Sequence, residues 1–243
     1  MTISVIVCAH NEARYLPACL YSLRAQTRPP DSIVVVDNAS TDETGDVARA
    51  VPGVTVIHEP RKGLPVARET ARRAADSDVL AYVDADCRVP LQWIERVEAR
   101  FARNDSLVAV TGPYRFYDWH RTGRSLVAVY DRLIAPPTHA ALHRLVGAGA
   151  ILYGGNFAVR RDALERIGGF DASIEFHGED TNLGRRLTPV GRVALSSDCW
   201  VWTSARRYKA MGTAKVFSLY VRNFWSEILR HRPSDSDHVD VRS

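Results

Sequence analysis

Two carboxylates stand one residue apart in the segment VDADCRVP, residues 83–90. If they end a β-strand, Asp84 and Asp86 face the same way, because side chains alternate along a strand with a period of two. Two like charges held so close favour a cation beside them. Mg²⁺ or Mn²⁺ fits this pair, because such an ion binds through one or two carboxylates and is completed by substrate phosphates and water. A turn or a helix cap is the more common reason for such a pair, so the surrounding fold matters.

A second polar cluster follows the apolar run of VVVDNASTDET, residues 34–44. We expect Ser40 or Thr41 to cap the next helix, since either hydroxyl can accept a hydrogen bond from a first-turn N–H. Capping does not account for Asp37, because a carboxylate at the end of a buried strand needs a partner of its own, and a ligand N–H or hydroxyl is a candidate. A third cluster, His-Asn-Glu at residues 10–12, follows the first apolar run.

Strands that alternate with helices would bring these clusters together. The predicted strands are residues 3–9, 32–38, 54–59 and 79–86, and the predicted helices between them are residues 13–26, 41–51 and 63–75. This order is typical of an α/β fold, a mostly parallel sheet with helices on both faces. Ligands bind such sheets at the carboxyl ends of the strands, which is where all three clusters fall.

The second half of the chain has a less regular pattern. It predicts a helix over residues 91–104, a strand over 107–114, and an apolar helical region over 124–146 that Pro136 and Pro137 interrupt. We interpret this half as substrate-recognition structure.

Size and composition narrow the class of protein. A chain of 243 residues with 46% hydrophobic residues is enough for one large domain and an appendage. Its 32 Lys and Arg nearly balance its 28 Asp and Glu, so no nucleic-acid partner is expected. The four cysteines lack the paired spacing of a zinc site, which predicts free thiols. No basic leader precedes the first apolar run and no run approaches the roughly 20 residues that span a bilayer, so a cytoplasmic protein is expected.

Six ordered motifs resemble those of the family 2 glycosyltransferases, which have the nucleotide-sugar-binding GT-A (Rossmann-like) fold. They are SVIVCAHNEARYLPACLYSL, VVVDNASTDET, GLPVARETA, YVDADCRVP, GGNFAVRRDALERIGGFD and GED. The resemblance runs from about residue 3 to residue 207. It implies a catalytic domain over 1–207, with a nucleotide-binding half at about 1–110 and an acceptor-binding half at 111–207, followed by a C-terminal segment over 208–243.

Carried over position by position, the resemblance implies a donor site. Asp37 would accept a hydrogen bond from the base, and Arg68 would contact the nucleotide. Ala9 and Glu12 would line the nucleotide pocket. Asp84 would touch the ribose or the metal, and Asp86 would ligate the metal. The family often has a second acid where this chain has Asn38.

The same resemblance implies a reaction. Asp180 would be the general base that deprotonates the acceptor hydroxyl, and Glu179 would position the acceptor, although two acids also favour a helix N-terminus by themselves. Asn156 and Gly155 would contact the acceptor or the donor sugar. Arg206 and Arg207 would stabilise the departing diphosphate. A single base and no covalent nucleophile predict inversion at the anomeric carbon.

A histidine metal ligand is common in relatives near this last region, but WVWTSARRYK, residues 200–209, has none. His10 and His177 are the candidate substitutes, although a histidine beside a motif is more often structural.

The C-terminal segment predicts an amphipathic helix over residues 215–230, followed by a disordered terminus. From residue 206 to residue 232 the chain has seven Arg or Lys and one acid, Glu227. The apolar face would comprise Phe217, Tyr220, Val221, Phe224, Trp225 and Ile228. It would either dock on the catalytic domain or rest on an anionic membrane, at its inner face, beside a lipid-linked acceptor.

Two other functions compete with the leading interpretation. A sugar-phosphate nucleotidyltransferase would need a glycine-rich loop after the first strand, and CAHNEARYLP has no glycine. A non-catalytic nucleotide-sugar-binding protein would not need Asp86 and Asp180. The sequence leaves the donor open between UDP- and GDP-sugars, and the acceptor open among a glycan, a lipid-linked sugar and a small molecule.

Overall fold

A computed structural model describes residues 1–174 and 178–230. Within these residues, one sheet of seven strands has the order β3-β2-β1-β4-β7-β5-β8, and a second sheet pairs β6 with β9. The strands of the large sheet are β1 (Ile3–Ala9), β2 (Ser32–Asn38), β3 (Val54–Glu59), β4 (Val79–Val83), β5 (Leu107–Thr111), β7 (Asn156–Arg160) and β8 (Arg192–Leu195). The small sheet consists of β6 (Tyr114–Phe116) and β9 (Val201–Thr203).

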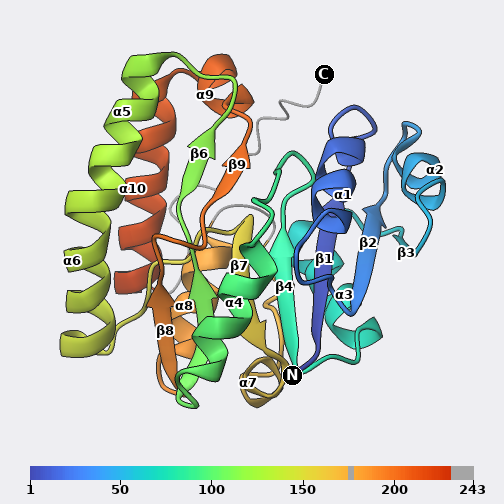
Figure 1. Cartoon of the computed structure of the whole chain (residues 1–243). Helices are drawn as coiled ribbons and strands as arrows, with labels where there is room; N and C mark the ends of the chain where they lie inside the picture. The colour runs from blue at the N-terminus through green and yellow to red at the C-terminus, as the bar shows by residue number, and fades with distance from the viewer. Residues whose placement is uncertain (175–177, 231–243) are drawn as a thin grey trace.

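Helices cover both faces of the large sheet, as predicted (Figure 1). Alternate side chains of β1 enter two different cores, because Val5 and Val7 pack on one face and Ile6 packs on the other. The first core includes side chains of α1 (Leu16–Arg24), α2 (Thr44–Arg49) and α4 (Trp93–Ala102). The second includes side chains of α3 (Leu64–Ala74), α7 (Arg161–Arg166) and α8 (Glu179–Leu187).

The direction of each strand decides what meets at each edge of the sheet. Strands β3, β2, β1 and β4 are parallel, so their carboxyl ends share one edge. Strand β7 runs antiparallel to β4, with Asn156 opposite Val83. The residues just before β7 therefore reach the same edge as the residues just after β4.

The prolines do not interrupt the helical region of the second half, contrary to the prediction. Helix α5 (Arg121–Val129), a π-helical turn (Tyr130–Ile134), α6 (Ala135–Ala140) and a second π-helical turn (Ala141–Val146) follow one another without a break, and Figure 1 shows α5 and α6 as one rod. Pro136 and Pro137 follow the first π-helical turn. They lie in the first turn of α6, where a proline's missing N–H is tolerated.

The predicted cap of α2 is also wrong. Its first N–H groups donate no hydrogen bond to Ser40 or Thr41; instead, Asp42 accepts the N–H of Thr44 at 3.0 Å. The Ser40 hydroxyl accepts the N–H of Asn11 at 3.1 Å, and the Thr41 N–H donates to the Asn11 side chain at 2.8 Å. These polar residues tie the loop after β2 to the loop after β1, so their role is to hold two strand ends together.

The C-terminal segment forms α9 (Arg206–Met211) and α10 (Thr213–Arg230), and α10 packs against α8 and α9. Of the apolar face predicted from the sequence, only Ile228 is buried. The buried face instead contains Val216, Leu219, Asn223 and Glu227. No helix in residues 1–174 or 178–230 is long and apolar enough to cross a bilayer. The predicted disordered terminus lies outside the described residues.

Polar partners on α8 explain why the other face is turned inward. The Asn182 amide donates to the Glu227 carboxylate at 3.0 Å, and the Arg185 guanidinium lies 3.3 Å from it. A helix face with an acid is stable against a neighbour that supplies donors to that acid. Helix α10 therefore docks on the rest of the protein, but through another face than the one predicted from the sequence.

Candidate functional site

The carboxyl ends of β1, β2 and β4 bring the predicted donor-site residues to one edge of the sheet. Ala9 is the last residue of β1, is buried, and pairs in register with Asp37 on β2. Asp84 follows β4 directly, and its N–H donates to the Gly155 carbonyl at 3.3 Å. Residues from the two halves of the chain, Asp84 and Gly155, are therefore neighbours here.

Asp37 has partners within the chain. Its carboxylate accepts the N–H of Ser40 at 3.3 Å and lies 3.3 Å from the His58 ring. The neighbouring Asn38 explains the departure from the family pattern, because its amide donates to the carbonyls of Glu59 and Arg61 and accepts the N–H of Gly63. An aspartate could accept the last bond but could not donate the first two.

His10 and His177 do not supply a metal ligand in the described structure. The His10 ring bonds the Asn38 carbonyl at 2.8 Å. His177 lies outside the described residues. Within residues 1–174 and 178–230, no cluster of three or more His, Cys, Asp or Glu side chains is placed to hold a metal ion.

Arg206 lies beside two other predicted site residues, Glu12 and Asp86. We call these three residues the Arg206 cluster. The Arg206 guanidinium donates both its Nη groups to the Glu12 carboxylate and lies over the Tyr15 ring. Its Nε lies 3.2 Å from Asp86 Oδ2. Burial raises the pKa of Asp86 to about 7, although Arg206 opposes that shift. The cluster thus places one guanidinium between two buried carboxylates.

A second group, the Arg68 cluster, comprises Arg68, Glu179 and Asp180. Arg68 is 2% exposed and donates to the Gly154 carbonyl at 2.6 Å. Its Nη1 lies 3.8 Å from Glu179 Oε1, too far for a hydrogen bond. The contact of Arg68 with a nucleotide stays a prediction. Arg68 links α3 to the loop before β7 and to the start of α8.

Asp180 lies in the first turn of α8, just after Gly178, which has a φ of 83°. Its carboxylate accepts the N–H of Thr181 at 2.8 Å. Burial raises the pKa of Asp180 to about 7, and the charge of Glu179 adds to that shift while Arg68 opposes it. A carboxyl group with a pKa near the working pH is suited to accept a proton.

Two glycines next to carboxylates lie between these clusters. A Cβ on Gly155 would lie 2.0 Å from the Asp84 carboxylate, which is a clash. A Cβ on Gly154 would lie 3.4 Å from the Asp180 carboxylate, which is an ordinary contact. Gly155 therefore gives Asp84 the room to approach the backbone, whereas its contact with a sugar stays a prediction.

Asn156, predicted to contact a sugar, has hydrogen-bond partners within the chain. It is 1% exposed, and its amide donates to the carbonyls of Gly112 and Cys199 at 2.8 Å each. Its Oδ1 accepts the indole N–H of Trp93 at 3.1 Å. Both amide donors are used within the chain and the side chain is buried, and the sugar contact stays a prediction.

Several residues near the site were missed by the sequence analysis. The Tyr114 hydroxyl accepts the N–H of Gly155 at 2.6 Å, and the Tyr153 hydroxyl donates to Asp131. Arg207, predicted to contact a diphosphate, donates to the Tyr220 hydroxyl on α10 at 3.3 Å. Burial lowers the pKa of Arg207, but Tyr220 and the nearby carboxylates outweigh that effect and raise it. No sequence motif pairs α10 with this edge of the sheet, because the contact depends on how the helices pack.

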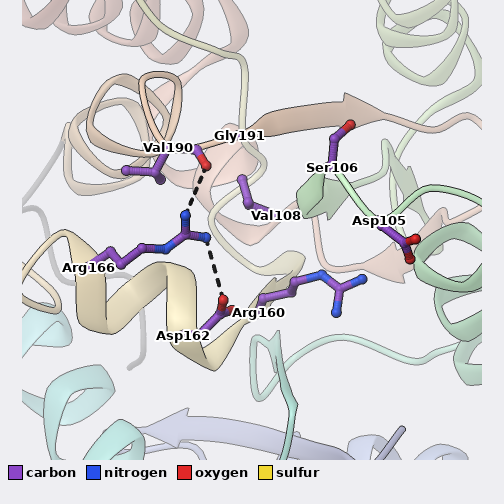
Figure 2. A pocket seen from close by; sticks show the side chains of 8 residues that line it. All are labelled: Asp105, Ser106, Val108, Arg160, Asp162, Arg166, Val190 and Gly191. Carbon is purple, nitrogen blue, oxygen red and sulfur yellow. Dashed lines mark hydrogen bonds and ion pairs between the residues drawn. The ribbon is translucent and has the colours of Figure 1, made fainter.

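A hollow with a volume of about 360 Å³ lies at the opposite edge of the sheet, where β5 and β8 begin (Figure 2). It lies beside the end of β7 and the turn before β8, and Figure 2 shows Arg166 reaching Val190 and Asp162. The amino ends of parallel strands do not usually bind ligands in such sheets, and none of the predicted site residues lines this hollow.

The chain belongs to glycosyl transferase family 2, whose sequence model matches residues 4–168. The described structure has the GT-A fold of these enzymes, with C-terminal helices added. Among curated proteins, it is 27% identical over 196 residues to the glycosyltransferase AglE of Haloferax volcanii, a match that covers 78% of this chain and 62% of AglE. The pre-mycofactocin glycosyltransferase of Mycobacterium tuberculosis is 28% identical over 200 residues, with 78% and 39% covered.

Two solved structures show the same fold. The mannosyltransferase PcManGT of Pyrobaculum calidifontis, in complex with GDP-Man and Mn²⁺, has a TM-score of 0.71 at 23% identity, covering 94% of this chain and 63% of that one. Glucosyl-3-phosphoglycerate synthase of M. tuberculosis, in complex with Mn²⁺, UDP and phosphoglyceric acid, has a TM-score of 0.66 at 20% identity, covering 94% and 78%. The chain spans less than two thirds of the length of the curated relatives described above.

Proposed function

We propose that this chain transfers a sugar from a UDP- or GDP-sugar to an acceptor hydroxyl with inversion. The observation that carries this proposal is the position of Asp180, a carboxyl group with a pKa near 7 beside Gly154, on the same sheet edge as Asp84 and Asp86. In a single displacement, the base that deprotonates the acceptor and the site that binds the donor diphosphate must lie close together, because the two substrates react directly.

The donor would lie over the carboxyl ends of β1, β2 and β4. Asp37 would accept a hydrogen bond from the base, and Ala9 and Glu12 would line the pocket. Arg206 and Arg207 would supply positive charge beside the diphosphate. The shared edge of the sheet supports this arrangement.

A divalent ion fits the acidic residues of this site. Asp84 and Asp86 supply oxygen ligands, and the rise in the pKa of Asp86 from burial and from Asp84 would be relieved by a cation. With no third protein ligand among the described residues, Mg²⁺ or Mn²⁺ would use these carboxylates, the diphosphate and water. When bound, the ion would neutralise the charge that develops on the leaving diphosphate.

Asp180 would take the proton of the acceptor hydroxyl as the hydroxyl oxygen bonds to the anomeric carbon. The bond from that carbon to the diphosphate oxygen breaks, and its electron pair leaves with the nucleotide. Glu179 would position the acceptor. Its charge also raises the pKa of Asp180, which strengthens Asp180 as a base.

The acceptor would be a glycan or a lipid-linked sugar. Peripheral contact with a membrane through α10 would suit the second of these, and the surface that supports such contact is described below.

A thermal-shift experiment tests the donor site first. The purified chain would be melted with UDP, GDP, TDP or ADP, with and without Mn²⁺, and a ligand at 100 times its dissociation constant should add about 2.7 kcal/mol of stability. We expect one nucleotide to stabilise the chain only with metal, and Asp86→Ala to lose that effect. Asp105→Ala removes an exposed acid at the opposite edge and should keep it. No shift with any nucleotide at millimolar concentration would contradict the donor site.

Turnover of Asp180→Asn separates an enzyme from a binding protein. Loss of a general base typically lowers the rate by about 10²–10⁴-fold, while nucleotide binding should remain. In the wild type, kcat/KM should rise with pH up to about 7, where the pKa of Asp180 lies. Unchanged turnover in this variant would remove Asp180 from the mechanism.

A further inference from the structure

An apolar stripe remains exposed on two helical segments that lie side by side. On α5 and the π-turn after it, Leu126, Val129 and Leu133 are 59%, 51% and 69% exposed. On α10, Phe217, Trp225 and Leu229 are 55%, 44% and 73% exposed. Figure 1 shows α10 beside the α5–α6 rod. The rings of Tyr130 and Phe217 touch edge to face with centroids 6.5 Å apart, which joins the two stripes into one surface, called here the helical face.

The charge around the helical face has one sign. Residues 121–146 and 213–230 contain seven Arg or Lys, all exposed: Arg121, Arg124, Arg132, Arg144, Lys215, Arg222 and Arg230. The two acids of the same ranges point inward. Asp131 accepts a hydrogen bond from Tyr153, and Glu227 is 0% exposed and bonded to Asn182. The charged side chains that these helices expose to solvent are therefore all positive.

We propose that the helical face docks on an anionic lipid bilayer, with α5 and α10 lying in the plane of its surface. Apolar and aromatic side chains flanked by basic ones are what an interfacial helix needs, because the first enter the acyl boundary and the second bind anionic headgroups. A second copy of this chain is a poorer occupant, because a two-fold contact through the helical face would bring seven cations against seven others.

Docking would orient the site as well as attach the chain. Tyr220 lies on α10 one residue before the exposed Val221, and its hydroxyl accepts the hydrogen bond from Arg207. The α10 side of the site would then adjoin the headgroups, where a lipid-linked hydroxyl lies. This last step rests on the proposed function, whereas the docking itself does not.

Sedimentation of the full chain with lipid vesicles tests the proposal. We expect binding to vesicles rich in phosphatidylglycerol, little binding to pure phosphatidylcholine, and weaker binding as salt is raised. Lys215→Glu with Arg222→Glu should lower partitioning at least tenfold, because each basic residue near such a surface contributes roughly fivefold. Phe217→Ser with Trp225→Ser should lower it too.

Matched controls come from α1, on the other side of the molecule (Figure 1). Arg24→Glu reverses an exposed charge, and Tyr21→Ser removes a ring that is 77% exposed. Both should bind vesicles as the wild type does, and all variants should keep the nucleotide-dependent thermal shift of the wild type. A folded chain that ignores anionic vesicles overturns the proposal. So does a dimer in solution that Phe217→Ser with Trp225→Ser dissociates, since a second copy would then cover the helical face.

Discussion

Arg206 lies between two carboxylates: it donates hydrogen bonds to Glu12 and forms an ion pair with Asp86. Arg68, in contrast, lies near two carboxylates and hydrogen-bonds to neither. In the Arg206 cluster the guanidinium is paired with Glu12 at hydrogen-bond distance. In the Arg68 cluster the closest approach to an acid is 3.8 Å, and Nη1 has no hydrogen-bond acceptor among the described residues. Each cluster has two carboxylates and one guanidinium, and burial raises the pKa of one acid in each, Asp86 and Asp180, to about 7. The clusters differ in whether the guanidinium is hydrogen-bonded to an acid.

This difference matches the roles proposed for the two sides. A site for a diphosphate needs positive charge that is already in place, because preorganised charges cost no rearrangement during the reaction. A general base needs the opposite, an environment that makes its negative form costly. Three changes to the chain would break or sharpen the comparison.

Arg206→Gln should have the largest effect on stability. It leaves Glu12 and Asp86 without their common cation, and removing one partner of a buried ion pair costs about 3–5 kcal/mol, less here because Arg206 is 18% exposed. Chemical denaturation would measure this loss. Arg49→Gln breaks a surface pair with Asp46, exposed by 58% and 77%, and should cost well under about 1 kcal/mol. Equal losses in both variants would show that the Arg206 cluster is not specially stabilising.

Gly155→Ala should come next, with a loss of about 1–3 kcal/mol from overpacking. Its new methyl group would meet the Asp84 carboxylate at 2.0 Å, so Asp84 must move, and nucleotide binding with metal should weaken. Gly154→Ala is the matched control, because its methyl group would find contacts no closer than 3.4 Å. Melting and nucleotide titration of the pair would measure both effects. If the two variants behave alike, the position of Asp84 does not depend on Gly155.

Asp180→Asn should change stability in the opposite direction, with a gain that depends on pH. The unfolded carboxyl group loses its proton near its ordinary pKa of 3.8 and the native one near 7, so the native state binds more protons between these values. The free energy of unfolding of the wild type therefore falls as pH rises through that window. Asparagine removes this fall.

The melting temperature of Asp180→Asn should exceed that of the wild type above pH 7, and the difference should shrink as pH falls and vanish toward pH 4. Asp105→Asn, at an exposed acid, should follow the wild type at every pH. A difference that is constant with pH would mean that Asp180 is not held in a proton-binding environment.

The regular first part of the chain was largely predictable. Its apolar runs become β1, β2, β3 and β4, and the helices between them follow, because a strand buried on both faces needs a continuous apolar sequence. The polar residues after those runs fall at one sheet edge because the carboxyl ends of parallel strands meet there. The surroundings of Asn156 and Arg68 were not predictable in the same way, and their ligand contacts stay predictions. Two loop carbonyls and the Trp93 indole of α4 hold Asn156, and Arg68 donates to the Gly154 carbonyl, although both residues stand in motifs that suggest ligand contact.

The face of α10 shows the same limit most clearly. Its aromatic stripe has the helical period of a buried face, yet the structure buries Asn223 and Glu227 instead. Hydrophobic periodicity records how many apolar residues share a face, but it does not record the donors that a neighbouring helix supplies.

The sequence by itself determined the α/β order, the family, and the acids at the strand ends, because these follow from local runs and spacings. Only the tertiary structure decided which cation balances which acid, which glycine makes room for Asp84, and which face of α10 meets solvent. Each of those depends on pairs of atoms that approach only after the sheet and helices have packed, and such distances are not a property of any short segment.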